Sequence, residues 1–78
     1  MSGVRETVIN TVMDKLGCDA GEVVDSAEFV NDLGCDSLDS IELVMEFEKE
    51  FEISVPDSDF EDIKTVGEAI SYLEGRVQ

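Results

Sequence analysis

Residues 36–51 of the chain read DSLDSIELVMEFEKEF, and this stretch decides the fold. It contains no Gly or Pro and is rich in Leu, Met, Glu and Lys, all of which form helices readily. Asp36 and Ser37, at its start, are both residue types that cap helix N-termini. The stretch therefore predicts a helix over residues 37–52, the strongest in the chain. One apolar stripe of this helix should face the core, and it consists of Leu43, Val44, Phe47 and Phe51.

A second apolar stripe runs along the same segment and consists of Leu38, Ile41 and Met45. Acidic side chains flank this stripe, namely Asp36, Asp39, Glu42, Glu46 and Glu48. An apolar strip with a charged rim is typical of a docking surface, so we predict that this face contacts partners with basic patches. Two alternatives stay open. The acids could be an ordinary solvated face, and Ile41 and Met45 could pack under the neighbouring loop.

The chain before this segment divides into a helix and a long loop. Apolar residues at helical spacing, from Val4 to Leu16, predict an amphipathic first helix that ends at Gly17. Residues 17–35 are rich in turn formers but contain apolar anchors, which predicts a long loop pinned to the core. A structureless loop of this length is unusual in a small domain. We therefore expect a short helical turn near residues 26–31.

Two further helices are predicted after the central segment. Pro56 prevents the long helix from continuing, and residues 58–61 have the capping-box spacing of a short helix of about two turns. Residues 65–68 repeat that spacing and predict a last helix, whose apolar face is Val66, Ala69, Ile70, Leu73 and Val77. No run alternates long enough to form a sheet. We expect an all-α fold: a small four-helix bundle of three longer helices and one short helix, with a long loop after the first, and residues 1–78 forming one domain.

Composition excludes several classes of function. The 78 residues include 5 basic and 20 acidic side chains, which gives a formal net charge of −15, and 42% of them are hydrophobic. Nucleic-acid backbones and anionic membrane surfaces require clustered Lys and Arg, so we expect neither as a partner. The chain has no His, which removes Ser-His-Asp and Cys-His catalysis and most zinc sites. We expect neither an enzyme nor a metal site.

The cysteines and the apolar runs indicate the compartment. Cys18 and Cys35 are too few for a disulfide framework and lack the CxxC spacing of redox or metal motifs, so we interpret them as reduced thiols. The longest uninterrupted apolar run covers residues 43–45, far too few for a signal peptide or a membrane span. These features predict a cytoplasmic protein that inserts into no membrane, and we expect a monomer.

Ser37 is the candidate site of modification. It lies where a glycine-containing loop meets the strongest helix, so its hydroxyl should face solvent. A phosphate ester at a helix N-terminus would meet free backbone N–H groups and the positive end of the helix dipole. The neighbouring Asp36 opposes this reading, because a carboxylate beside a bound anion is unfavourable. The alternative is that Ser37 or Asp36 is simply the N-cap of the helix.

The ordered set of motifs resembles acyl carrier proteins over nearly the whole chain. The set comprises Asp-Ser-Leu-Asp-Ser-Ile-Glu-Leu-Val-Met at residues 36–45 with Leu-Gly before it, the turn at residues 53–57, and the start of the last helix at residues 65–70. The resemblance implies that a separate phosphopantetheinyl transferase esterifies Ser37, flanked by Asp36 and Leu38, with 4'-phosphopantetheine. It implies a carrier, not a catalyst, that holds acyl chains as thioesters and delivers them to the enzymes of fatty acid synthesis. The chain begins at Met1 and contains no fused catalytic region or linker, so we expect a free-standing carrier.

The sequence departs from the family pattern at two positions. Cys35 stands where the family more often has alanine, and we interpret it as a buried structural residue because no basic residue lies nearby in sequence. Lys49 interrupts the acidic face, and we expect it to form an exposed ion pair with neighbouring glutamates. The alternatives for function are a polyketide-type acyl carrier and an acidic interaction domain without a prosthetic group. A calcium-binding module ranks lower, because the Asp-x-Asp-x-Asp-Gly loop is missing.

Overall fold

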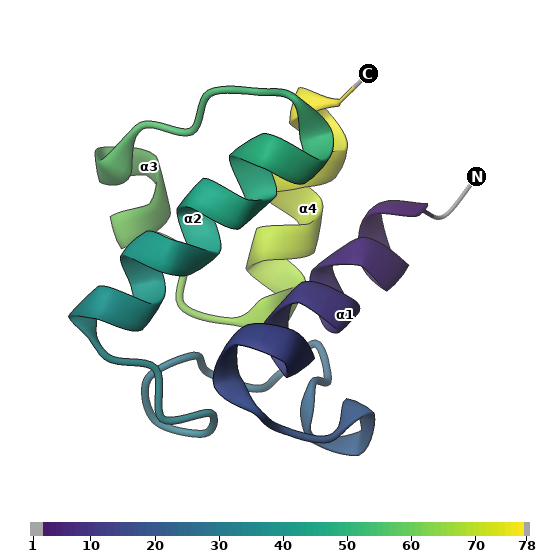
Figure 1. Cartoon of the computed structure of the whole chain (residues 1–78), viewed down its shortest axis with the longest axis vertical. Helices are drawn as coiled ribbons and strands as arrows, with labels where there is room; N and C mark the ends of the chain where they lie inside the picture. Colours follow the sequence, from purple (N-terminus) through teal and green to yellow (C-terminus); the bar gives the residue numbers. More distant parts are fainter. Residues whose placement is uncertain (1–2, 78) are drawn as a thin grey trace.

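Four α-helices form over residues 3–77, the part of the chain that the computed structural model describes (Figure 1). The fold is all-α, with three longer helices and one short one, as the sequence predicts. A long loop that contains the single 3-10 turn η1 follows the first helix. The elements are α1 (Gly3–Leu16), η1 (Ala20–Glu22), α2 (Ser37–Phe51), α3 (Asp57–Glu61) and α4 (Val66–Arg76).

The helices α1, α2 and α4 pack around a shared apolar core, in which α1 contacts both α2 and α4. In Figure 1, α2 runs diagonally through the bundle, with α1 on one side of it and the short α3 on the other. The predicted core stripe of α2 is confirmed for Leu43, Val44 and Phe47, which are buried, whereas Phe51 is only partly covered. The other buried hydrophobic residues are Val8, Val12, Val23, Ala27, Phe29, Cys35, Val55, Phe60, Val66, Ala69, Ile70 and Leu73.

The long loop is tied to the connection between α3 and α4 by backbone hydrogen bonds. The N–H of Phe29 donates to the carbonyl of Lys64 over 3.0 Å, and the N–H of Val66 donates to the carbonyl of Ala27 over 3.0 Å. The N–H of Gly67 donates to the carbonyl of Asp25 over 2.9 Å. A Cβ at Gly67 would lie only 3.0 Å from that carbonyl oxygen, so glycine permits the close approach. The predicted pinning of the loop to the core is confirmed for Val23 and Phe29, which are buried, and for Leu33, which is partly buried. It is wrong for Val24 and Val30, which we also expected as anchors, because their side chains are 47% and 65% exposed.

The helical turn in this loop lies earlier than expected. Residues 26–31 form turns and an isolated bridge rather than a helix, because their backbone groups pair with the α3–α4 connection. The helical turn is η1, at residues 20–22. It forms there because Asp19 and Glu22 make a capping box, in which the Asp19 N–H donates to the Glu22 carboxylate over 3.0 Å. The expectation for residues 26–31 is therefore wrong in position.

The short helix α3 also differs from its prediction. It has 5 residues, about one turn rather than two, and it begins at Asp57 with Pro56 in the N-cap position. The Pro56 carbonyl accepts the N–H of Asp59, so the chain already turns before Ser58, and no side chain caps the helix. The capping box predicted for Ser58 is wrong. The one predicted for α4 is confirmed, since Thr65 accepts the N–H of Glu68 over 3.2 Å.

None of the helices described between residues 3 and 77 is long and apolar enough to cross a membrane.

The last helix, α4, buries Val66, Ala69, Ile70 and Leu73, as its apolar spacing predicts. Val77 lies beyond its last turn and is exposed, so this residue does not belong to the buried face.

Candidate functional site

The start of α2 is fixed by Asp36, which is the N-cap. Its carboxylate Oδ1 accepts the N–H of Asp39 over 2.8 Å, and the Asp39 carboxylate accepts the N–H of Asp36 over 3.4 Å. The chain enters this cap through Gly34, whose φ of 71° lies in the left-handed region that favours glycine. Of the two candidates for the cap, the structure selects Asp36. The Ser37 hydroxyl is therefore not required to hold the helix end.

Ser37 is the first residue of α2, and its side chain is exposed. Within residues 3–77 its hydroxyl makes no hydrogen bond, and the backbone N–H groups of Ser37 and Leu38 are also without partners. The Asp36 carboxylate, which could have repelled an anion, is turned onto the Asp39 amide. A phosphate ester on Ser37 would therefore meet an accessible oxygen, two unused N–H donors and the positive end of the α2 dipole. This site fits a phosphopantetheine ester.

Ser40 differs from Ser37 although it lies only one turn further along α2. It is half-buried, and its hydroxyl oxygen lies 3.3 Å from the sulfur of Cys35. Cys35 is 2% exposed, which confirms its interpretation as a buried structural residue. Burial raises the pKa of the Cys35 thiol, and the hydrogen bond with Ser40 only partly offsets that increase. The thiol is therefore neutral at physiological pH, and both Cys35 and Cys18 are free of disulfides.

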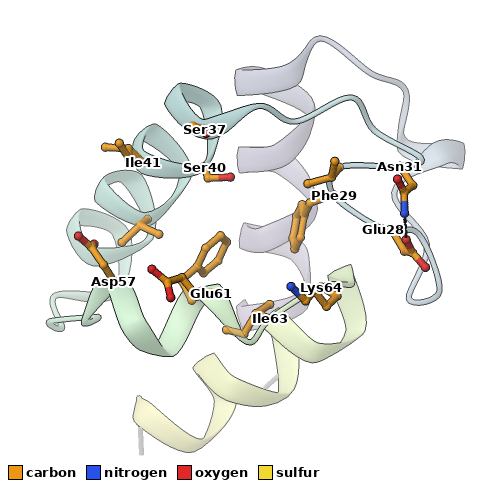
Figure 2. Close-up of a pocket in the computed structure, with 13 residues that line it drawn as sticks. Glu28, Phe29, Asn31, Ser37, Ser40, Ile41, Asp57, Glu61, Ile63 and Lys64 are labelled. Carbon is orange, nitrogen blue, oxygen red and sulfur yellow. Dashed lines mark hydrogen bonds between the residues drawn. The ribbon is translucent and has the colours of Figure 1, made fainter.

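A cavity of about 700 Å³ opens beside Ser37 (Figure 2). Figure 2 shows Ser37, Ser40 and Ile41 along α2, with Asp57 and Glu61 of α3 across from them and Phe29 on the side of the long loop. Much of the cavity wall is apolar, although charged and amide groups, including Glu61 and Lys64, also line it. Its apolar lining residues are Phe29, Val30, Ile41, Val44, Phe60 and Ile63. A cavity of this size suits an elongated apolar ligand.

The second stripe of α2 lies on the surface. Leu38, Ile41 and Met45 are 62%, 54% and 61% exposed, so the alternative in which Ile41 and Met45 pack under the loop is wrong. Three exposed apolar side chains in a row on one helix form a strip that water covers at a free-energy cost. Below, these three residues are called the apolar strip.

The acids beside the apolar strip are not equivalent. Glu42 is exposed and makes no hydrogen bond or ion pair within the described residues. Glu46 is half-buried and lies 3.6 Å from the Lys15 ammonium of α1, and Glu48 accepts the N–H of Val55 over 2.8 Å. The sequence predicts all the acids on one rim, but Glu46 also pairs with α1 and Glu48 also bonds to the segment that follows α2. The structure brings Asp36, Asp39 and Glu42 to the end of the strip nearest Ser37.

Two features of the site could not be read from the sequence. Lys49 is exposed and forms no ion pair among residues 3–77, so the expected pairing with neighbouring glutamates is wrong. The cavity wall was also missed, because Phe29, Phe60 and Ile63 come from the loop, from α3 and from the connection between α3 and α4. The only sequence feature that could have indicated these three residues is that they are apolar. They lie in short segments that have no helical pattern of apolar residues.

Comparison with known proteins decides the family. Residues 6–73 match the model of the phosphopantetheine attachment site family. The chain belongs to this family of acyl carrier proteins. Acyl carrier proteins from two strains of Porphyromonas gingivalis are each 57% identical to it over 74 residues, which covers 95% of this chain and 95% of each relative. A solved Mycobacterium tuberculosis chain assigned as an acyl carrier protein superposes with a TM-score of 0.87 at 33% identity and covers 94% of this chain and 97% of its own.

Membership of the acyl carrier protein family sets the cofactor, which is 4'-phosphopantetheine. It also sets the general role, since proteins of this family carry acyl groups. The prediction of an acyl carrier with a four-helix fold is confirmed. An acidic interaction domain without a prosthetic group does not agree with this family match, so that alternative is disfavoured.

Proposed function

We propose that Ser37 is the residue that carries 4'-phosphopantetheine and that this acyl carrier protein delivers intermediates of fatty acid synthesis. The observation that supports this most strongly is the difference between two hydroxyls one turn apart. Among residues 3–77 the exposed Ser37 hydroxyl, at the N-terminus of α2, makes no hydrogen bond, whereas the half-buried Ser40 hydroxyl contacts the Cys35 thiol. A transferase can reach the first without disturbing the fold.

The chain's own residues have a passive role in this chemistry. When bound, the prosthetic group supplies a terminal thiol that holds an acyl chain as a thioester. The apolar side chains of the cavity, among them Val44, Phe60 and Ile63, offer such an alkyl chain a place out of water next to Ser37. Burial of apolar surface contributes about 25 cal/mol of favourable free energy for each Å², which favours this placement of the alkyl chain. The protein shelters the cargo, and its partner enzymes perform the reactions.

Partner binding is proposed at the exposed face of α2. The apolar strip supplies contact area, and Asp36, Asp39 and Glu42 lie at its end nearest Ser37. A net charge of −15 attracts partners with basic patches from a distance, and the local acids fix the orientation of the complex. We propose the phosphopantetheinyl transferase and the enzymes of fatty acid synthesis as these partners. We propose that they meet a monomeric carrier in the cytoplasm.

Intact mass measurement tests the attachment site. Unmodified protein incubated with coenzyme A, magnesium and a phosphopantetheinyl transferase should gain one phosphopantetheine. Ser37→Ala should gain none, whereas Ser40→Ala should load like the unsubstituted protein. Fragment masses should place the group on Ser37. Location of the group on Ser40, or loading of Ser37→Ala, would refute the proposal.

Reconstitution tests the pathway. The loaded protein should accept a malonyl group and support chain elongation by purified enzymes of fatty acid synthesis. The Ser37→Ala variant is the matched control, because it keeps the fold and the acidic surface but lacks the attachment oxygen. Elongation by polyketide enzymes alone, with none by the fatty acid enzymes, would favour the polyketide-type carrier instead.

A further inference from the structure

The outer side of α3 is held by a connected set of polar contacts. The Tyr72 hydroxyl donates to the Asp59 carboxylate over 2.7 Å, and one Arg76 nitrogen donates to the Tyr72 oxygen over 2.6 Å. The other terminal nitrogen of Arg76 donates to the Ser54 carbonyl over 2.7 Å. The Arg76 guanidinium also lies 5.6 Å from the centre of the Tyr72 ring. Two residues of α4 thus hold both α3 and the segment that precedes it.

Few other contacts attach α3 to the bundle. The helix has 5 residues and no side-chain cap, and Phe60 is its only buried residue. An isolated single turn is unstable in water, so α3 depends on tertiary contacts. Phe60 supplies the apolar contact, since its ring packs against Phe29 and Phe47 at centroid distances of 5.9 Å and 6.4 Å. The hydrogen bond from Tyr72 to Asp59 supplies the polar one.

The same helix forms a wall of the cavity beside Ser37. Asp57, Phe60 and Glu61 line that cavity, and Figure 2 shows Asp57 and Glu61 on α3 across from Ser37 and Ser40. Asp59 lies on the same turn but is bonded to α4. Movement of α3 away from α4 would therefore move one wall of the cavity. The long loop on the opposite wall has less freedom, because backbone hydrogen bonds attach it to the α3–α4 connection.

We propose that Tyr72, supported by Arg76, is a positioning residue that latches α3 over the cavity and thereby controls how long a bound acyl chain stays shielded. Its effect on acyl chains rests on the proposed function, whereas its effect on α3 does not. Arg76 strengthens the latch because donation to the Tyr72 oxygen polarises the O–H bond toward Asp59. Burial, followed by the hydrogen bond to Asp59, raises the pKa of Tyr72, so its hydroxyl stays protonated and able to donate.

Amide hydrogen exchange on the unmodified protein tests the latch itself. The N–H groups of Asp62 and Ile63 bond to carbonyls of α3 and report its opening, and the N–H of Leu73 in α4 reports global unfolding. Tyr72→Phe removes one oxygen atom and should speed exchange at Asp62 and Ile63 by roughly twofold to tenfold, the range for loss of one partly exposed hydrogen bond. Exchange at Leu73 should change less.

Three matched variants separate a latch from general destabilisation. Asp59→Ala should reproduce the effect of Tyr72→Phe, whereas Asp59→Asn keeps an accepting oxygen and should restore slow exchange. Arg5→Gln removes another exposed polar contact, the one with Asp25 at 2.5 Å, and should leave the α3 amides unchanged. Unchanged α3 exchange in Tyr72→Phe, or an equal rise at Leu73, would overturn the latch. Failure of Asp59→Asn to restore slow exchange would overturn it too.

Loading with an octanoyl chain tests the consequence for cargo. Hydroxylamine should cleave the octanoyl thioester of Tyr72→Phe roughly twofold to tenfold faster than that of the unsubstituted carrier, in proportion to the exchange of α3. Faster amide exchange in α3 with an unchanged rate of thioester cleavage would overturn the proposal that the latch controls shielding of the acyl chain. If the unsubstituted carrier shields octanoyl no better than free octanoyl-pantetheine, the proposed cavity function fails, and the amide exchange data still decide whether the latch exists.

Discussion

The two sides of α2 are covered in very different ways. On the side of α1 and α4, Val8, Val12, Leu43 and Leu73 are almost completely excluded from water. On the other side, a single helical turn and a pinned loop border an open cavity of about 700 Å³. The packed side fixes the position of α2 and thus of Ser37, and the other side leaves the space that we propose for cargo. A small carrier needs both properties, because a fully packed bundle could shelter no acyl chain.

The largest expected effect is on the packed side. Leu43→Ala should lower the free energy of unfolding by about 2–5 kcal/mol, because it leaves a cavity at a residue with 0% exposure. Urea unfolding followed by circular dichroism measures this. Ile41→Ala, on the same helix but 54% exposed, is the control and should stay within about 0.5 kcal/mol. Equal losses from both variants would mean that α2 has no distinct core and surface sides.

A smaller effect is expected at the start of α2. Asp36→Ala removes the N-cap and should destabilise the fold by about 1 kcal/mol. Ser37→Ala should be nearly neutral, because the Ser37 side chain makes no hydrogen bond in the described chain. The same urea titration distinguishes the two. A greater loss from Ser37→Ala than from Asp36→Ala would show that the serine has a structural role that the geometry does not reveal.

The exposed face offers a kinetic test. Glu42→Lys should slow association with the transferase several-fold at low salt and flatten the dependence of that rate on ionic strength. Stopped-flow measurement of binding provides the rate. Ile41→Ala and Met45→Ala should act mainly through faster dissociation, because apolar contacts do not steer at long range. Glu74→Lys on α4 changes the net charge by the same amount and is the control. If it slowed association as much as Glu42→Lys does, overall acidity alone would explain the rate, and the proposed local docking face would be wrong.

The smallest effect concerns the start of α4. The Glu68 carboxylate accepts the N–H of Lys64 over 2.6 Å and that of Thr65 over 3.1 Å, and these bonds hold its pKa below the ordinary value of 4.5. A folded pKa below the unfolded one gives stability above pH 4.5 that is lost as the pH falls through the folded pKa. The stability difference between the unsubstituted protein and Glu68→Gln should therefore shrink below pH 4.5. A constant difference from pH about 3 to about 7 would contradict this.

The sequence predicted those parts of the molecule whose structure is determined locally. Helices α1, α2 and α4 have continuous apolar stripes, and Asp36 and Thr65 are recognisable caps. The length of α3 and the position of η1 were missed, because both depend on where Pro56 and Asp19 turn the chain. The acidic side chains of α2 can be predicted to be exposed, but the sequence does not show that the Glu46 carboxylate pairs with a lysine of α1.

The site was predictable only in part for the same physical reason. Motifs around Ser37 lie in one segment and can be recognised in order along the chain. The cavity walls come from three separate segments, the loop, α2 and the region of α3, so no spacing rule places Phe29 opposite Ile41. Glu48 is similar, because its bond to the Val55 N–H requires the chain to fold back after α2.

Nuclear Overhauser contacts of an octanoyl chain, loaded on isotope-labelled protein, test the contrast between the two sides of α2 most directly. We predict contacts from the octanoyl protons to Val44, Phe60 and Ile63 on the cavity side, and none to Val8 or Val12 on the packed side. Contacts to Val8 or Val12, or an octanoyl chain that contacts no side chain of the cavity, would contradict this prediction.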